Sequence, residues 1–172
     1  MERYNIAFVP KFKSNEFIAL ATEIIDKPFS YILGNKSIPH VTICQFYSEE
    51  HKLGDLSKKI CFESSDFNLH LSFREISHTS FKKPVYWVSL LPENTLKLHE
   101  VFNYISKLVN PLRTDDYDPH LTLFNYAYIN QKNEINLEKK INDKVSIQDE
   151  FELIIGTSDC FGQLTRIIKI LT

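Results

Sequence analysis

The chain has few cysteines, and they are not spaced for disulfide bonding or metal binding. Cys44, Cys61 and Cys160 are the only cysteines among 172 residues, and they lie far apart in the sequence. Disulfide-rich domains and Cys-x-x-Cys metal sites need cysteines at close, paired spacings. The sequence therefore predicts neither class, and it predicts no metal or other cofactor.

Net charge and long apolar runs are also lacking. The 20 Lys and Arg residues face 22 Asp and Glu residues, which leaves a net charge of -2. Long nucleic acids are bound largely through their phosphates and need a basic surface. The near balance of positive and negative residues does not indicate such a surface. A short nucleotide still qualifies as a ligand. No window approaches the about 18 apolar residues of a membrane span, and the chain does not open like a signal peptide. We therefore expect a cytoplasmic protein with no membrane contact and no obligate protein partner.

The composition that is present suits one globular domain spanning residues 1–172. Apolar residues make up 43% of the chain and charged residues 24%, which are ordinary values for a protein with a core. Apolar spacing predicts helices near 15–26, 53–60, 98–109 and 137–143. The same reading predicts strands at 4–9, 29–33, 40–46, 67–73, 85–91, 120–126, 151–156 and 163–171. Helices and strands alternate without regular strand–helix–strand units, which favours an α+β fold with largely antiparallel sheets.

One short pattern occurs twice in the chain. Residues 39–44 read PHVTIC and residues 119–124 read PHLTLF, so that Pro-His-aliphatic-Thr-aliphatic recurs. From the chain's own frequencies of these residue types, a second match by chance has a probability on the order of one in a thousand. The repetition therefore indicates a duplication or a shared role.

The spacing inside each copy predicts a reactive surface. Side chains two positions apart on a strand point to one face, so His40 lies beside Thr42 and His120 beside Thr122, while the aliphatic residues between them face a core. One neutral imidazole can activate water while a protonated one protonates a leaving oxygen. Threonine hydroxyls can hold the non-bridging oxygens of a phosphate. Two such strands facing each other would suit metal-independent phosphodiester chemistry.

The paired motifs resemble those of the two-histidine (2H) phosphoesterase superfamily, whose LigT-like members include 2'-5' RNA ligases and cyclic phosphodiesterases. Three further features are similar to the family pattern: Phe46 six residues past the first histidine, the segment SFKKPVYWVSL at 80–90, and the closing segment FELIIGTSDCFGQLTRIIKIL at 151–171. The resemblance thus spans nearly the whole chain and is most specific in the two motifs.

The resemblance implies a fold and an activity. The fold would be bilobal α+β, with two largely antiparallel sheets, flanking helices, pseudo-two-fold symmetry and one His-x-Thr strand from each lobe at a central cleft. The activity would be hydrolysis of 2',3'-cyclic phosphates, or handling of 2'-5' phosphodiesters, in nucleotides or RNA ends. By this analogy His120 is the general base and His40 the general acid, and Thr42 and Thr122 position the phosphate.

The chain departs from the family pattern at one position. Many LigT-like members carry Arg five residues past the second histidine, where this chain has Asn125. The departure weighs against ligation and long-RNA binding more than against hydrolysis of cyclic phosphates. Arg74, Lys82, Lys83 and Arg113 are candidates to supply the missing charge.

A non-catalytic nucleotide- or RNA-binding module that uses the same cleft is the alternative function. A descendant that only binds would be expected to lose at least one of the two histidines and two threonines. The sequence retains all four, which favours the enzyme.

Other residues carry weaker functional interpretations. Four aromatic residues are candidates for stacking on a base, although strand aromatics more often belong to a core: Phe46, Tyr86, Trp87 and Phe124. Strand alternation places Cys44 on the face of His40, but a small buried cysteine is favoured over a nucleophile. The segment HEVFN at 99–103 begins like a zinc-binding helix, yet Asn103 stands where the second ligand histidine is required.

Overall fold

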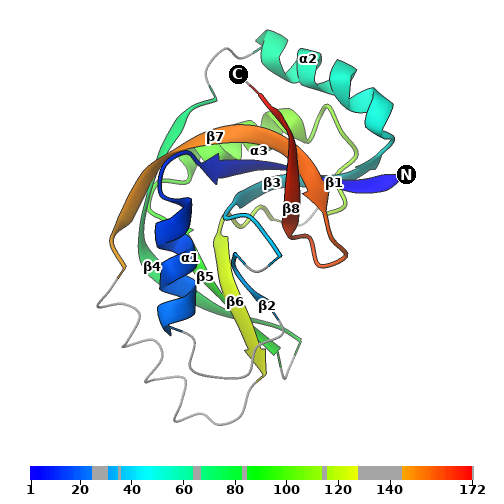
Figure 1. Ribbon diagram of the computed structural model, residues 1–172. Helices are drawn as coiled ribbons and strands as arrows, with labels where there is room; N and C mark the ends of the chain where they lie inside the picture. Colours follow the sequence, from blue (N-terminus) through cyan, green and yellow to red (C-terminus); the bar gives the residue numbers. More distant parts are fainter. Residues whose placement is uncertain are drawn as a thin grey trace.

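The computed structural model describes residues 1–24, 31–34, 36–63, 67–82, 85–113, 116–127 and 145–171. The predicted helix near 137–143 and the first residues of the predicted strand at 29–33 lie outside them. The elements follow in the order β1 (Glu2–Pro10), α1 (Ser14–Ile24), β2 (Tyr31–Ile32), β3 (Val41–Ser48), the 3-10 helix η1 (Glu50–Lys52), α2 (Leu53–Glu63), β4 (Leu69–Lys82), β5 (Val85–Pro92), α3 (Leu96–Ile105), β6 (Leu121–Ala127), β7 (Ile147–Ser158) and β8 (Leu164–Ile170), as Figure 1 shows.

The described strands form one antiparallel sheet in the order β1-β3-β6-β5-β4-β7-β8, with β2 paired to β6. Strand β7 also pairs with β1, so the path of hydrogen-bonded strands closes on itself. The predicted α+β fold with antiparallel pairing is confirmed. The two predicted sheets are joined into one, because β4 pairs with β7 on one side and β3 with β6 on the other. The bilobal, pseudo-two-fold arrangement stays a prediction.

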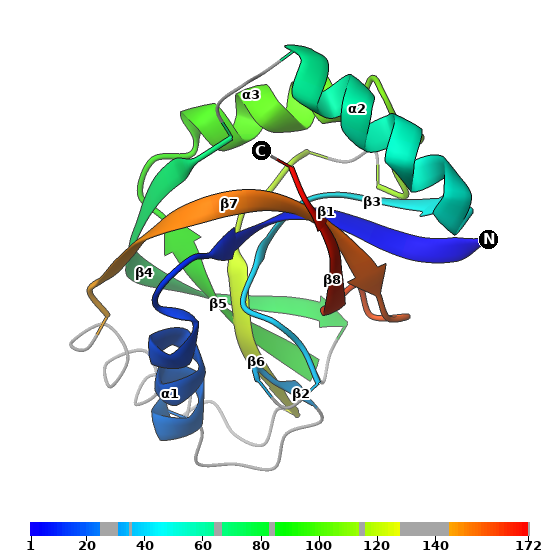
Figure 2. The ribbon, with the colours of Figure 1, turned by 45° about the horizontal axis from the view of Figure 1, so that its top comes forward.

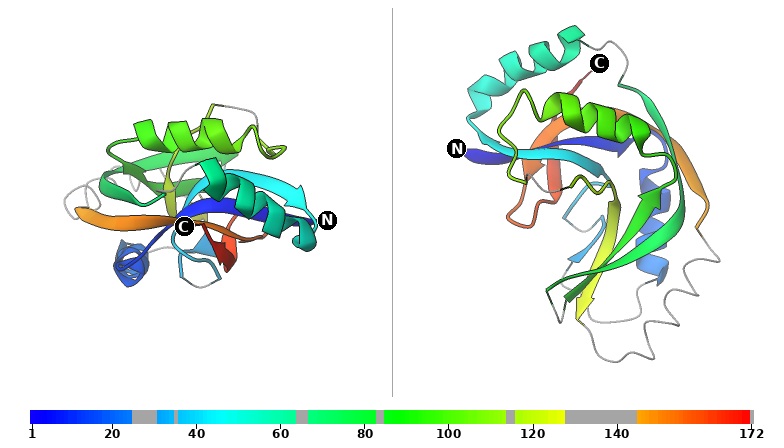
Figure 3. Two further views of the ribbon diagram at one scale, coloured as in Figure 1. Left: turned by 90° about the horizontal axis from the view of Figure 1, so that it is seen from above. Right: turned by 180° about the vertical axis from the view of Figure 1, so that it is seen from behind.

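The helices cover the sheet on more than one side. Figure 3 shows α1 and α3 on opposite sides of β1 and β7, and Figure 2 shows α2 next to α3, where the Tyr104 hydroxyl donates to the Lys59 carbonyl at 3.1 Å. The buried face of α1 is an apolar stripe at helical spacing, Phe17, Leu20, Ala21 and Ile24. The Phe17 ring lies 5.6 and 6.0 Å from the rings of Phe73 and Phe151. Burying such a ring stabilises the fold by about 2–3 kcal/mol.

Strand β4 is longer than the predicted strand at 67–73. Its first residues pair with β7, and its later residues pair with β5 through registers such as Ser77↔Ser89. From Arg74 onward the sequence lacks alternating apolar residues. The alternating pattern that predicts a strand therefore ends there, although the backbone of β4 continues to pair with β5. The length of the strand is therefore seen in its backbone pairing with β5 and not in the sequence pattern.

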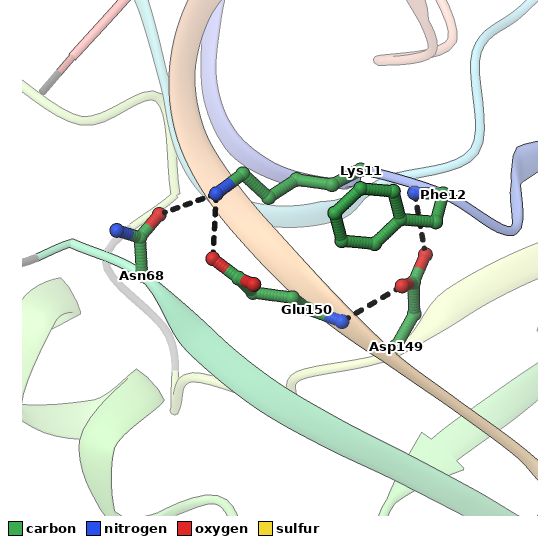
Figure 4. Close-up of polar contacts among 5 residues, drawn as sticks. All are labelled: Lys11, Phe12, Asn68, Asp149 and Glu150. Carbon is green, nitrogen blue, oxygen red and sulfur yellow. Dashed lines mark hydrogen bonds and ion pairs between the residues drawn. The ribbon is translucent and has the colours of Figure 1, made fainter.

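A buried carboxylate fixes the turn between β1 and α1. Asp149, on β7, accepts hydrogen bonds from the backbone amides of Phe12 at 3.0 Å, Lys13 at 2.7 Å and Glu150 at 2.8 Å. Figure 4 shows the Lys11 side chain extending away from this carboxylate, so that its ammonium contacts Glu150 at 2.5 Å and Asn68 at 3.2 Å. The turn is thereby held on β7 while the Phe12 side chain stays 75% exposed.

Candidate active site

The two His-x-Thr strands meet at a single backbone pair. Val41, the first residue of β3, pairs with Leu121, the first residue of β6, and both side chains are fully buried. Because side chains alternate along a strand, His40 and Thr42 lie on the face opposite Val41, and His120 and Thr122 on the face opposite Leu121. In an antiparallel pair these are the same face of the sheet. The structure thus brings the four predicted residues together.

A β-bulge follows the threonine in each strand. Ile43 has no partner between the pairs Ala7↔Thr42 and Ile6↔Cys44, and Leu123 has none between Ser89↔Thr122 and Val88↔Phe124. A bulge resets the alternation and redirects the side chains beyond it. Each bulge therefore lies the same number of residues past the histidine of its own strand.

The bulges correct the prediction for two aromatic residues and for the face on which Cys44 lies, while the favoured prediction of a small buried cysteine is confirmed. Strict alternation placed Cys44 on the face of His40, and Phe46 was a candidate for stacking on a base. Beyond the bulge both side chains turn into the core, each 3% exposed. Phe124 is 1% exposed for the same reason. Neither phenylalanine has a surface on which a base could stack. Burial also raises the pKa of the Cys44 thiol to about 12, which fits the small buried hydrophobe and not a nucleophile.

Beyond the bulges stand two amide side chains, of which the sequence reading named Asn125 only as a departure from the family pattern and missed Gln45. Gln45 and Asn125 each stand five residues past their histidine. The Gln45 amide nitrogen donates to the Gly162 carbonyl at 2.7 Å, and the Asn125 amide oxygen accepts from the Tyr31 backbone amide at 2.9 Å. Asn125, where the family pattern has Arg, therefore holds β2 against β6.

Both histidine rings are oriented in the same way. His40 Nδ1 lies 2.7 Å from the Ile38 carbonyl oxygen, and His120 Nδ1 lies 2.8 Å from the Asp118 carbonyl oxygen. A carbonyl only accepts hydrogen bonds, so the Nδ1 atom carries a proton in each ring. Nε2 is thereby left as the nitrogen that takes up or gives a proton in each ring.

The two histidines have different surroundings. His40 is 6% exposed, and burial lowers its pKa to about 4, a shift to which the nearby charge of His120 adds and which the Ile38 carbonyl and the Asp159 carboxylate oppose. His40 is therefore neutral at pH 7, with a free electron pair on Nε2. The His120 side chain is 38% exposed, and its Nδ1 lies 3.8 Å from a carboxylate oxygen of Asp118. That carboxylate offers an ionic partner to a protonated ring.

The threonine hydroxyls are available to a ligand. The Asn5 amide nitrogen donates to Thr42 Oγ1 at 3.3 Å, so the Thr42 hydroxyl accepts from the protein and keeps its own hydrogen for another acceptor. Thr122 is 9% exposed, and no side-chain hydrogen bond joins its hydroxyl to another described residue. Both hydroxyls can therefore donate to an anion.

Tyr117 links the two halves of the site, and the sequence reading missed it. Its hydroxyl donates to the backbone carbonyl of Thr42 at 3.0 Å. Its ring stacks on Phe102 of α3 with centroids 4.5 Å apart. Since β3 and β6 share one backbone pair, this contact between the segment before His120 and β3 is a second tie across the site.

Of the remaining predicted residues, the structure describes the side chains of Trp87, Arg74 and Arg113. Trp87 pairs with Asn125 across β5 and β6, and its half-buried ring lies 5.6 Å from that of Tyr31. The side chains of Tyr86 and Lys82, and the whole of Lys83, lie outside the described part of the chain. Arg74 is exposed and pairs with Glu93 at 3.5 Å, and Arg113 is also exposed.

Sequence comparison finds no matching protein family and no matching curated protein. The fold, in contrast, matches solved structures. Kluyveromyces marxianus Usb1 aligns with a TM-score of 0.59 at 14% identity, over 98% of this chain and 96% of that chain. The same protein with uridine monophosphate aligns with a TM-score of 0.59 at 12% identity, over 98% and 97% of the two chains. The chain therefore has a fold similar to that of Usb1. No helix in the described ranges is long and apolar enough to cross a membrane.

Proposed function

We propose that the chain is a metal-independent phosphodiesterase of the two-histidine type, which acts on 2',3'-cyclic phosphates or 2'-5' linkages in nucleotides or RNA ends. The observation that carries the proposal is the common orientation of His40 and His120, each held through Nδ1 by the carbonyl two residues earlier. This arrangement leaves two Nε2 atoms, beside two threonine hydroxyls, for proton transfer to and from a phosphodiester.

The surroundings of the histidines support roles opposite to those implied by the family analogy. Neutral His40 takes a proton from water through Nε2, and the resulting hydroxide attacks phosphorus. Protonated His120 then gives its Nε2 proton to the leaving 3' oxygen, so a 2',3'-cyclic phosphate opens to a 2'-phosphate. Thr42 and Thr122 donate to the non-bridging oxygens as charge develops on them. After release of the product His40 loses its proton to solvent and His120 takes one up from solvent, which restores both rings for the next turnover.

Two further observations support the proposal. The bulges after Thr42 and Thr122 stand at the same distance from their histidines, which supports the predicted pseudo-two-fold relation of two lobes. The similarity of the fold to Usb1, of which one structure is with uridine monophosphate, supports a nucleotide ligand.

The test is turnover and binding of uridine 2',3'-cyclic phosphate by the purified protein and by His40→Ala and His120→Ala. Each substitution should lower turnover by at least ~10²-fold, the lower end of what positioned proton transfer contributes. Binding without turnover in the unaltered protein would favour the non-catalytic module instead. Full turnover in both variants would refute the mechanism.

A further inference from the structure

The turn from Asp159 to Gly162, between β7 and β8, lies next to the candidate active site. The Gly162 carbonyl accepts from the Asn5 amide at 3.2 Å, and the same Asn5 amide contacts the Thr42 hydroxyl at 3.3 Å. The Asp159 carboxylate is close enough for its charge to act on both His40 and Tyr31. The turn therefore borders the face that carries the histidines.

The turn is held in one conformation by contacts within it. The Asp159 Oδ1 atom accepts from the amides of Phe161 at 2.9 Å and Gln163 at 2.8 Å. Gly162 has a φ of +88°, and a Cβ atom at this position would lie 2.4 Å from the Gln45 amide nitrogen. Glycine is thus favoured by the backbone conformation, and the end of the Gln45 side chain packs closely against it.

Contacts from β1 hold the same turn from outside. Arg3 donates to the Cys160 carbonyl at 2.8 Å and also to the Gln45 side-chain oxygen. Gln45 in turn donates to Gly162. A segment tied on both sides loses little conformational entropy when a ligand binds to it.

This rigid turn presents an aromatic ring to solvent. Phe161 is 74% exposed, whereas Phe46 and Phe124 on the His-x-Thr strands are buried. Trp87 and Tyr31 are half-buried and pack against each other. Phe161 is therefore the most exposed aromatic side chain on the described segments that border the site.

We infer that Phe161 is the platform on which the base of a nucleotide stacks while its phosphate lies between His40 and His120. The inference rests on the proposed function, since it takes a nucleotide phosphate as the group bound at the histidines. Base stacking on an aromatic side chain tolerates any base, so Phe161 contributes affinity for nucleotides with little selection among them. The ring is a binding residue and takes no part in proton transfer.

Phe12 provides a matched control elsewhere on the molecule. It is exposed to the same extent, 75%, and its backbone amide is also held by an aspartate side chain, that of Asp149 (Figure 4). It follows the end of β1 beyond Pro10, whereas Ala7 is the β1 residue that pairs with Thr42. Phe12→Ala therefore removes an equally exposed ring away from the histidines.

The experiment compares Phe161→Ala, Phe161→Trp and Phe12→Ala with the unaltered protein, using uridine 2',3'-cyclic phosphate and the base-free 2',3'-cyclic phosphate of methyl riboside. Phe161→Ala should weaken binding of the uridine compound by roughly 5- to 150-fold, the range for loss of one base–aromatic stack, and raise KM accordingly. Phe161→Trp should keep the affinity. Phe12→Ala should change nothing, and the base-free compound should not respond to Phe161→Ala.

The other possible results distinguish a failure of the Phe161 inference from a failure of the proposed function. Equal affinities for Phe161→Ala and Phe12→Ala, or equal weakening of both compounds, would overturn the inference, whether or not the protein is an enzyme. If nucleotide binding is weakened only by Phe161→Ala but no turnover occurs, Phe161 is the platform and the catalytic proposal fails. If the unaltered protein neither binds nor hydrolyses the nucleotide, both fail. Urea unfolding of the variants controls for damage to the fold.

Discussion

Replacing His40 by asparagine should abolish a large part of the pH dependence of folding stability. The side chain is buried, and its pKa in the folded chain is about 4, below its ordinary value of 6.5. One pKa unit corresponds to about 1.4 kcal/mol, so the difference amounts to ~3 kcal/mol. Asparagine offers its amide nitrogen to the Ile38 carbonyl in place of Nδ1 and does not titrate.

The direction in which folding stability changes with pH follows from proton binding to the folded and unfolded chains. Between pH 6.5 and about 4 the unfolded chain binds a proton at position 40 that the folded chain does not, so lowering the pH through this window favours unfolding. The contribution of neutral His40 is fully present above pH 6.5 and is lost by about pH 4. Carboxylates titrate in both proteins and cancel in the difference.

The assay is urea unfolding of the unaltered protein and His40→Asn at several pH values from 4 to 8. The free energy of unfolding of the unaltered protein, relative to the variant, should fall by ~3 kcal/mol on going from pH 7 to pH 4. His51→Asn is the control, because that side chain is 74% exposed and stays in water in both states. A relative stability of His40→Asn that is constant across this range would refute the account of the buried neutral imidazole.

Three further predictions concern the proposed reaction. The acid limb of kcat/KM for uridine 2',3'-cyclic phosphate should lie near pH 4, below the ordinary histidine range, because His40 must be neutral; a limb at pH 6.5 would contradict this. EDTA should leave the rate unchanged, since two imidazoles supply both proton transfers, whereas loss restored by a divalent ion would indicate metal-assisted hydrolysis. Tyr117→Phe keeps the ring but loses the bond to Thr42, and should lower kcat several-fold and stability by about 1 kcal/mol. Tyr104→Phe, which loses a comparable bond between α2 and α3, should lower stability alone, and an equal loss of kcat would assign Tyr117 a merely structural role.

The sequence predicted which histidines and threonines lie together better than it predicted the direction of the side chains that follow them. The repeated Pro-His-aliphatic-Thr pattern was visible because it depends on residues close together in the chain, and strand alternation then placed each histidine beside its threonine. The sequence also contained an indication of the bulges. Ile43-Cys44 and Leu123-Phe124 are pairs of adjacent apolar residues, and each pair interrupts the alternation of apolar and polar residues. The amide five residues past each histidine repeats in the same way.

Other parts of the site could not be read from the sequence. Tyr117 acquires its role by reaching the Thr42 carbonyl, and the turn that carries Phe161 acquires its place by bonding to Asn5 and Gln45. Such contacts join residues far apart in the chain and leave no periodic pattern. The lowered pKa of His40 likewise comes from burial by the surrounding fold.

The measurement that tests the central claim most directly is rescue by a better leaving group. In a uridine 2',3'-cyclic phosphate analogue with sulfur as the departing bridging atom, the thiolate leaves without needing a proton. The proposed mechanism predicts that this analogue restores turnover to His120→Ala, which lacks the general acid, and does not restore it to His40→Ala, which lacks the general base. Rescue of His40→Ala alone would reverse the two roles. If both variants turned over the ordinary substrate at the rate of the unaltered protein, that result would contradict two-histidine catalysis at this site.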